Sequence, residues 1–170
     1  MPRLFIAVRP PEEVIEELSA LHRKDQRGVR FVHPENWHIT LRFLGDADPD
    51  VVVNALRDAV LAPARARLGP AVDVFAERAL VVPVSGLEAL AASVIECTRG
   101  LGEPPRKRFL GHLTVARVKS SVPMPRALGT LVNAAFDVEE IELISSRLDP
   151  QGARYATLHT WAVDGRQVLG

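Results

Sequence analysis

Two short segments of the chain alternate between polar and aliphatic residues in the same way. Residues 38–41, His-Ile-Thr-Leu, are followed 74 positions later by residues 112–115, His-Leu-Thr-Val. A period of two predicts a half-buried strand, with the His and Thr on one face and the aliphatic residues on the other. The pattern therefore predicts two strands that each present an imidazole and a hydroxyl.

The rest of the chain alternates between strand-like and helix-like patterns, with proline and glycine at the boundaries. The predicted strands are 3–8, the two His/Thr segments, 71–76, 79–84, 136–147 and 154–163, with a hairpin turn at 149–152. The predicted helices run from Pro10 to about Gln26, from Asp48 to before Pro63 and from Ser85 to about Gly100, with a short helix at 126–134.

Each His/Thr segment follows a predicted helix at nearly the same spacing. One helix ends near Gln26, 12 residues before His38, and another ends near Leu101, 11 residues before His112. This repeated order predicts an internal duplication. We expect one α+β domain, residues 1–170, made of two lobes related by a pseudo-twofold axis, with the His/Thr strands at the centre.

Composition narrows the classes of partner. The formal net charge is zero, so no global field attracts the chain to nucleic acid, and any such partner must be recognised locally. The longest apolar run, 79–84, is too short to cross a bilayer. With one cysteine and no export signal, the cytoplasm is the expected location.

Two imidazoles on one face suit acid–base chemistry near neutral pH, because histidine titrates near pH 6.5. A single His on a strand is more often structural; the matched pair favours function. A metal site is the chemical rival, although neither motif has the spacing of a familiar zinc site. The other histidines, His22, His33 and His159, are expected to be solvated or structural, although His33 could line the cleft. Trp37 and Trp161 are expected to pack in the core.

The residues around both motifs resemble those of a known family. The first motif lies in NWHITLRFLG (36–45) and the second in FLGHLTVAR (109–117). The chain also opens with RLFIAV (3–8) and carries SS (145–146) and YATL (155–158) near its end. Together these segments resemble the two-histidine phosphoesterases, in particular the bacterial RNA 2',3'-cyclic phosphodiesterases, historically called 2'-5' RNA ligases.

The resemblance implies a fold and an activity. Two lobes with antiparallel sheets would face a central cleft, with helices on the outside. A 2',3'-cyclic phosphate at an RNA or nucleoside end would be hydrolysed to a 2'-phosphate without a metal or other cofactor. We expect the partner to be such an RNA end or a small cyclic nucleotide, no membrane to be involved, and the chain to be a monomer. Joining of RNA ends through 2'-5' bonds, an ADP-ribose cyclic phosphate substrate, and RNA binding without turnover remain alternatives.

The resemblance also assigns roles to individual residues. His38 and His112 would be the acid–base pair, with His38 provisionally the acid and His112 the base. Thr40 and Thr114 would donate hydrogen bonds to phosphate oxygens. Phe43 would hold the nucleotide, and Arg117 would lie near the phosphate.

Strict alternation opposes the last two assignments. Counting by two from each histidine puts Arg42 and Ala116 on the catalytic face in place of Phe43 and Arg117. A bulge or strand end near Leu41 and Ala116 would be needed to restore them. The family often has a proline before the second histidine, where this chain has glycine, and an aromatic residue where this chain has Val-Pro (82–83). Finally, the basic run 106–108 before the second motif could guide an RNA backbone or be a solvated loop.

Overall fold

The computed structural model describes residues 3–75 and 78–163. Within them the chain forms ten strands, three α-helices and one 3-10 turn. In chain order these are β1 (Arg3–Val8), α1 (Glu12–Leu18), β2 (Val29–Phe31), η1 (Pro34–Asn36), β3 (Ile39–Asp46), α2 (Pro49–Leu56), β4 (Arg65–Leu68), β5 (Asp73–Phe75), β6 (Ala79–Ser85), α3 (Glu88–Cys97), β7 (His112–Val118), β8 (Ala134–Asp137), β9 (Glu140–Asp149) and β10 (Gly152–Ala162).

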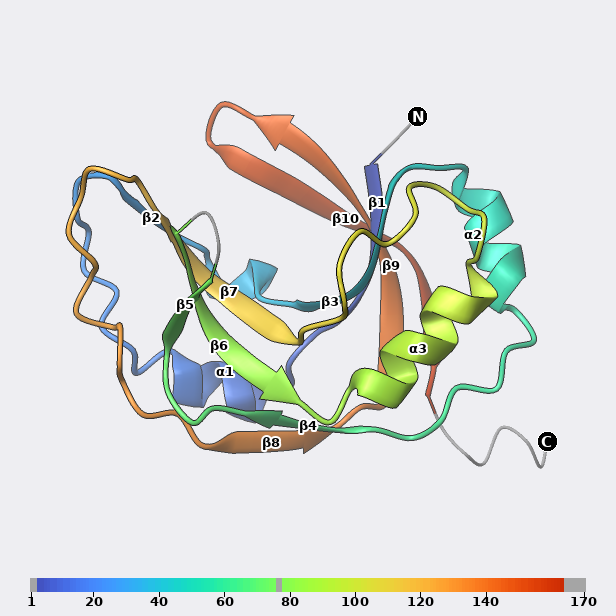
Figure 1. Ribbon diagram of the computed structural model, residues 1–170, viewed down its shortest axis with the longest axis horizontal. Helices are drawn as coiled ribbons and strands as arrows, with labels where there is room; N and C mark the ends of the chain where they lie inside the picture. Colours follow the sequence, from blue (N-terminus) through green and yellow to red (C-terminus); the bar gives the residue numbers. More distant parts are fainter. Residues whose placement is uncertain (1–2, 76–77, 164–170) are drawn as a thin grey trace.

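The strands form one curled antiparallel sheet with two halves (Figure 1). Its order is β10-β9-β1-β3-β7-β6-β4-β8, with β2 beside β7 and β5 beside β6. The halves meet where β3 pairs with β7, through the single residue pair Ile39 and Leu113. The predicted α+β class with antiparallel sheets is confirmed.

The two halves repeat the same pairing register. Every pair recorded between β6 and β7 from Ala79 to Val82 matches a β1–β3 pair whose residue numbers are both lower by 74. At the equivalent position in each half the pairing skips one residue, Leu41 on β3 and Val115 on β7, which makes a β-bulge. The β1–β3 pairing has a second irregularity, at Leu44. Ile39 and Leu113 are also 74 positions apart, so the pseudo-twofold axis passes between them.

The helices interlock the two halves. Helix α1 follows β1 in the chain but contacts β8, which belongs to the other half of the sheet. Helix α3 follows β6 but contacts β3 and α2 (Figure 1). The buried side chains of both helices belong to one continuous hydrophobic core with the aliphatic residues of β3 and β7. The two halves therefore share the main core, and a small separate cluster of Phe5, Ala7 and Ile144 lies in the first half.

The predicted order of elements is largely confirmed, with errors at helix ends. Strand β1 and the hairpin turn at 149–152 lie where they were predicted, and residue 76 of the predicted strand 71–76 lies outside the described residues. The first helix was predicted to reach Gln26 but ends at Leu18, because the polar residues 22–25 offer no apolar side chain to the core. Strands β2 and β4 were not predicted, because three or four residues carry too little pattern.

The predicted short helix at 126–134 is wrong. This segment forms turns and leads into β8, which the prediction had merged with β9. Its backbone bonds to the segment before β5: the Gly129 amide donates to the Val72 carbonyl, and the Val72 amide donates to the Thr130 carbonyl. Gly129 has a positive φ of 85°, which ends any helical path there.

No helix in the described part of the chain is long and apolar enough to cross a membrane. The cytoplasmic location stays a prediction.

The bulge in β3 turns Arg42 away from the face on which strict alternation placed it. Its side chain is only 3% exposed and ties β3 to the end of α3. Nη1 donates to the carbonyls of Phe43 (2.8 Å) and Glu103 (2.7 Å), Nη2 donates to that of Leu101 (2.8 Å), and Nε donates to Thr98 Oγ1 (3.2 Å). Arg42 therefore holds the loop that follows α3 against β3.

Replacing Arg42 by methionine should lower the free energy of unfolding by about 2 kcal/mol, because three partly buried carbonyl oxygens would lose their donors. Denaturant unfolding followed by circular dichroism measures this, with Arg57→Met at the exposed end of α2 as the matched control. An unfolding midpoint equal to that of the control variant would show that these bonds contribute nothing to stability.

Candidate active site

The two motif histidines are held by the same backbone contact. His38 Nδ1 lies 2.8 Å from the carbonyl oxygen of Asn36, and His112 Nδ1 lies 2.8 Å from that of Leu110. A carbonyl oxygen only accepts, so Nδ1 carries a proton in both rings. In the neutral ring this leaves the lone pair on Nε2, which can take up a proton. Each histidine is thus set in one tautomer and one orientation by the residue two positions before it.

The central strand pair brings the motif side chains together. One step to either side of Ile39 and Leu113, antiparallel geometry sets His38 across from Thr114 and Thr40 across from His112. Side chains directly opposite each other have Cβ atoms roughly 5 Å apart. These four residues are half-buried, whereas Ile39 and Leu113 are fully buried on the other face. The structure therefore places two imidazoles and two hydroxyls in one small area of the sheet.

His38 lies in an apolar surrounding. Its ring is 4.8 Å from that of Phe5 and 5.4 Å from that of Tyr155. Burial lowers the pKa of His38 from the usual 6.5, and the positive charges of Arg9 and His112 act in the same direction. The bond from Nδ1 to the Asn36 carbonyl opposes them. The neutral form of His38 is therefore favoured at neutral pH.

His112 has a different surrounding. Its ring contacts one aromatic side chain, that of Phe75, with 5.1 Å between ring centroids. The two imidazoles thus make the same contact with the backbone and have the same tautomer, but different side chains surround them.

The bulges determine which face of the sheet carries Phe43 and Arg117. Beyond Leu41 and Val115 the alternation shifts by one, and the burial of residues 38–44 matches that of 112–118 position by position. Phe43 is 42% exposed, and Arg117 is also exposed. Both share a face with the threonines, as the resemblance implied and strict alternation opposed.

Charged groups surround this face. The guanidinium of Arg3 lies 5.3 Å from the centre of the Phe43 ring. Arg117 is close enough to Tyr155 to influence its hydroxyl: burial raises the pKa of Tyr155, and Arg117 opposes that rise. Arg9 Nε forms a 3.0 Å ion pair with Glu142, and its Nη1 donates to the Glu35 carbonyl at 2.8 Å.

Several residues at this site were missed in the sequence. Phe5 and Arg9 are an even number of positions apart, so alternation along β1 places them on one face. Nothing in the sequence showed that β1 would lie beside β3 with Phe5 toward His38. Tyr155 belongs to a segment that carries the family resemblance, but its contact with His38 was not predicted. That contact depends on the long β9–β10 hairpin. His33 lies with Arg9 and Tyr155 around a neighbouring cavity of about 540 Å³.

The expected packing residues behave as predicted. Trp37 and Trp161 are buried, and His159 packs against Trp161 with 4.9 Å between ring centroids. Across the described residues, no three potential His, Cys, Asp or Glu ligands are grouped so that they could hold a metal ion.

Comparisons with known proteins place this arrangement in a family. Residues 8–68 match the family model of LigT-like phosphoesterases. The RNA 2',3'-cyclic phosphodiesterase of Thermus thermophilus is 35% identical, over 96% of this chain and 91% of that protein. The enzyme of the same name from Methanocaldococcus jannaschii is 25% identical, over 94% of this chain and 99% of that protein.

Solved structures have the same fold. The crystal structure of TT0787 of Thermus thermophilus has a TM-score of 0.78 and 32% identity, covering 95% of this chain and 97% of that one. LigT of E. coli, crystallised with 3'-AMP, has a TM-score of 0.74 over 95% of this chain and 98% of that one, at 24% identity. The chain belongs to the LigT-like phosphoesterase family.

Proposed function

We propose that this protein hydrolyses 2',3'-cyclic phosphate ends of RNA, or cyclic nucleotides, to 2'-phosphomonoesters, with His38 and His112 as the acid–base pair and without a metal. The observation that carries the proposal is the matched pair of imidazoles, each with its Nδ1 proton directed to a backbone carbonyl. Relatives named RNA 2',3'-cyclic phosphodiesterase support the substrate class.

The reaction needs two proton transfers, and the site offers two rings for them. Water attacks phosphorus and gives a proton to the neutral base through its Nε2 lone pair. The bond from phosphorus to the ribose 3'-oxygen breaks, and that oxygen takes a proton from the protonated ring. The product is a 2'-phosphate and a free 3'-hydroxyl, and the two histidines end with exchanged protonation states.

The remaining motif residues supply donors for the phosphate and a surface for the nucleotide. We assign Thr40 and Thr114 as donors to the non-bridging oxygens, whose negative charge grows in the transition state. Arg117 adds a charge-assisted donor from the same face. Phe43 offers an exposed ring on which the base can stack.

We retain His38 as the acid at the 3'-oxygen and His112 as the base for water. Burial makes protonated His38 scarcer but a stronger proton donor, because its pKa is lowered. A bound anionic phosphate favours the charged ring and would restore its population. The pH profile cannot assign the roles, because exchanging the pKa values of acid and base leaves the profile unchanged.

We also propose that the domain arose by internal duplication. The matching register of β1–β3 and β6–β7 from Ala79 to Val82 supports this, as does the bulge at the same position in both halves. One chain supplies both histidines of the proposed site, which supports a monomer as the active form.

Incubation with RNA that ends in a 2',3'-cyclic phosphate tests the proposal. The expected product is the 2'-phosphate, and EDTA should leave the rate unchanged. His38→Ala and His112→Ala should each lose about 10²–10⁴ in kcat. His22→Ala, on the exposed surface, is the control and should retain full activity. A 3'-phosphate product would contradict the proposed leaving group, and tight binding without turnover would show a binding module.

The pKa of His38 can be measured by NMR titration of the imidazole. In the free protein it should titrate below pH 6.5, because burial and Arg9 disfavour the charged ring. Arg9→Gln should raise this pKa, since it removes one positive charge and frees the negative charge of Glu142. The pH profile of kcat/KM should be bell-shaped. Unchanged titration of His38 in the variant would rule out Arg9 as a cause.

A leaving-group substitution assigns the two roles. If sulfur replaces the 3'-oxygen of the cyclic substrate, the thiolate leaves without needing a proton. His38→Ala should then lose much less activity on the sulfur substrate than on the oxygen substrate, whereas His112→Ala should lose the same on both. The opposite pattern would make His112 the acid.

A further inference from the structure

We propose that the basic loop 106–108, together with the pocket behind it, binds the RNA strand on the 5' side of the terminal nucleotide. This inference rests on the proposed function and extends it. It assigns a substrate class: oligomeric RNA ends would be preferred over cyclic mononucleotides.

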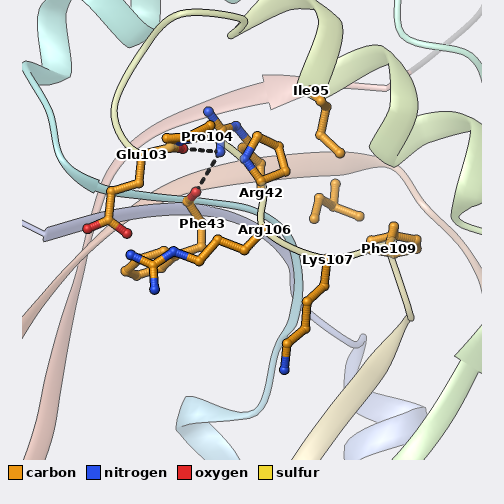
Figure 2. A pocket seen from close by; sticks show the side chains of 10 residues that line it. Arg42, Phe43, Ile95, Glu103, Pro104, Arg106, Lys107 and Phe109 are labelled. Atoms are coloured by element: carbon orange, nitrogen blue, oxygen red, sulfur yellow. Dashed lines mark hydrogen bonds between the residues drawn. The ribbon is translucent and has the colours of Figure 1, made fainter.

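The loop lies beside the proposed nucleotide site. Phe43 from β3 and residues 103–107 line one cavity of about 320 Å³, with Phe109 and Ile95 at its far end (Figure 2). Figure 2 shows Arg106 extending along this cavity toward Phe43. The loop then continues directly to His112, four residues after Arg108. The cavity therefore lies against β3 and is lined by the loop that leads into β7.

Three consecutive cations face solvent here. Arg106, Lys107 and Arg108 are exposed, and none of them forms an ion pair in the part of the chain that the structure describes. One carboxylate, that of Glu103, also lines the cavity. Because the whole chain carries no net charge, this local excess of positive charge is what a polyanion can recognise. Cations beside an exposed aromatic ring are typical of sites for single-stranded nucleic acid.

The start of the loop is fixed to β3. Arg42 donates to the carbonyls of Leu101 and Glu103, and the Glu103 amide donates to the Leu44 carbonyl at 2.8 Å. Gly102 has a positive φ of 59°, and a Cβ there would lie 2.2 Å from the Leu44 carbonyl oxygen. These contacts fix the point from which residues 104–108 extend, so part of the loop is already ordered before a ligand binds.

We infer that the ligand of this loop is a neighbouring phosphate of the strand and not the reacting one. Phe43 is five positions from His38 and three from Thr40, which lies across from His112. At about 3.3 Å per residue, roughly 10 to 16 Å separates Phe43 from the two histidines along β3. The reacting phosphate lies at the histidines, and the terminal base reaches Phe43. Charges beyond Phe43 therefore meet the next phosphates of the strand.

The test compares two substrates in a triple variant, Arg106→Ala, Lys107→Ala and Arg108→Ala. For a short oligoribonucleotide with a 2',3'-cyclic end, kcat/KM should fall at least about tenfold. For a cyclic mononucleotide it should stay unchanged. The control is the triple variant Arg57→Ala, Arg65→Ala and Arg67→Ala, which removes the same charge from the end of α2 and from β4.

Salt dependence gives a readout without turnover. In a His112→Ala background, anisotropy of a labelled oligoribonucleotide measures binding. Removing three phosphate contacts should reduce the slope of log affinity against log salt by about 2, at about 0.7 per contact for single strands.

The two proposals fail in different ways. If wild type converts neither substrate, the proposed function fails, while the binding slope still tests the loop. If the loop variant retains full kcat/KM on the oligoribonucleotide and the same salt slope, the loop does not bind RNA. An equal loss on both substrates would place the loop in the catalytic centre and also overturn the inference.

Discussion

The site depends on one backbone pairing, that of Ile39 with Leu113. Among the described residues it is the only pair between β3 and β7, and it lies on the pseudo-twofold axis. Because side chains alternate along each strand, burial of these two residues forces their neighbours onto the opposite face. Those neighbours are the histidine and threonine of each motif. If one of these strands slipped by one residue, its imidazole would move to the buried face, so the register determines whether the two imidazoles share a face.

The bulges at Leu41 and Val115 allow each strand to present one further side chain on the face that carries the histidine and threonine. Before the bulge, alternate residues supply the imidazoles and hydroxyls of the candidate site. After it, the same face carries Phe43 in one half and Arg117 in the other. The residue displaced in the first half, Arg42, becomes a buried support for the loop after α3. The bulge in β3 thus has two results. It brings Phe43 to the face of the candidate site, and it directs Arg42 to the loop that precedes His112.

The sequence predicted the parts of this structure that depend on local pattern. The two His/Thr strands have a strict period of two, and α2 and α3 have clear starting residues, so both kinds of element were found. The sequence showed that a bulge or strand end would be needed to bring Phe43 and Arg117 to the histidine face. It could not show that a bulge forms, because a bulge depends on how the neighbouring strand pairs. The approach of Phe5 and Tyr155 to His38 was not predictable for the same reason: both depend on the order of strands in the sheet.

The two halves use one backbone to create two different environments. The residue that is equivalent to Phe5 by the 74-residue offset is Ala79, and the one equivalent to Arg9 is Pro83. The first half therefore surrounds His38 with an aromatic ring and a nearby positive charge that the second half lacks at the same positions. Acid–base catalysis by a pair needs one ring protonated and the other neutral, since one must give a proton while the other accepts one. Repetition fixes where the imidazoles lie, and divergence of their neighbours gives His38 the buried surrounding that lowers its pKa.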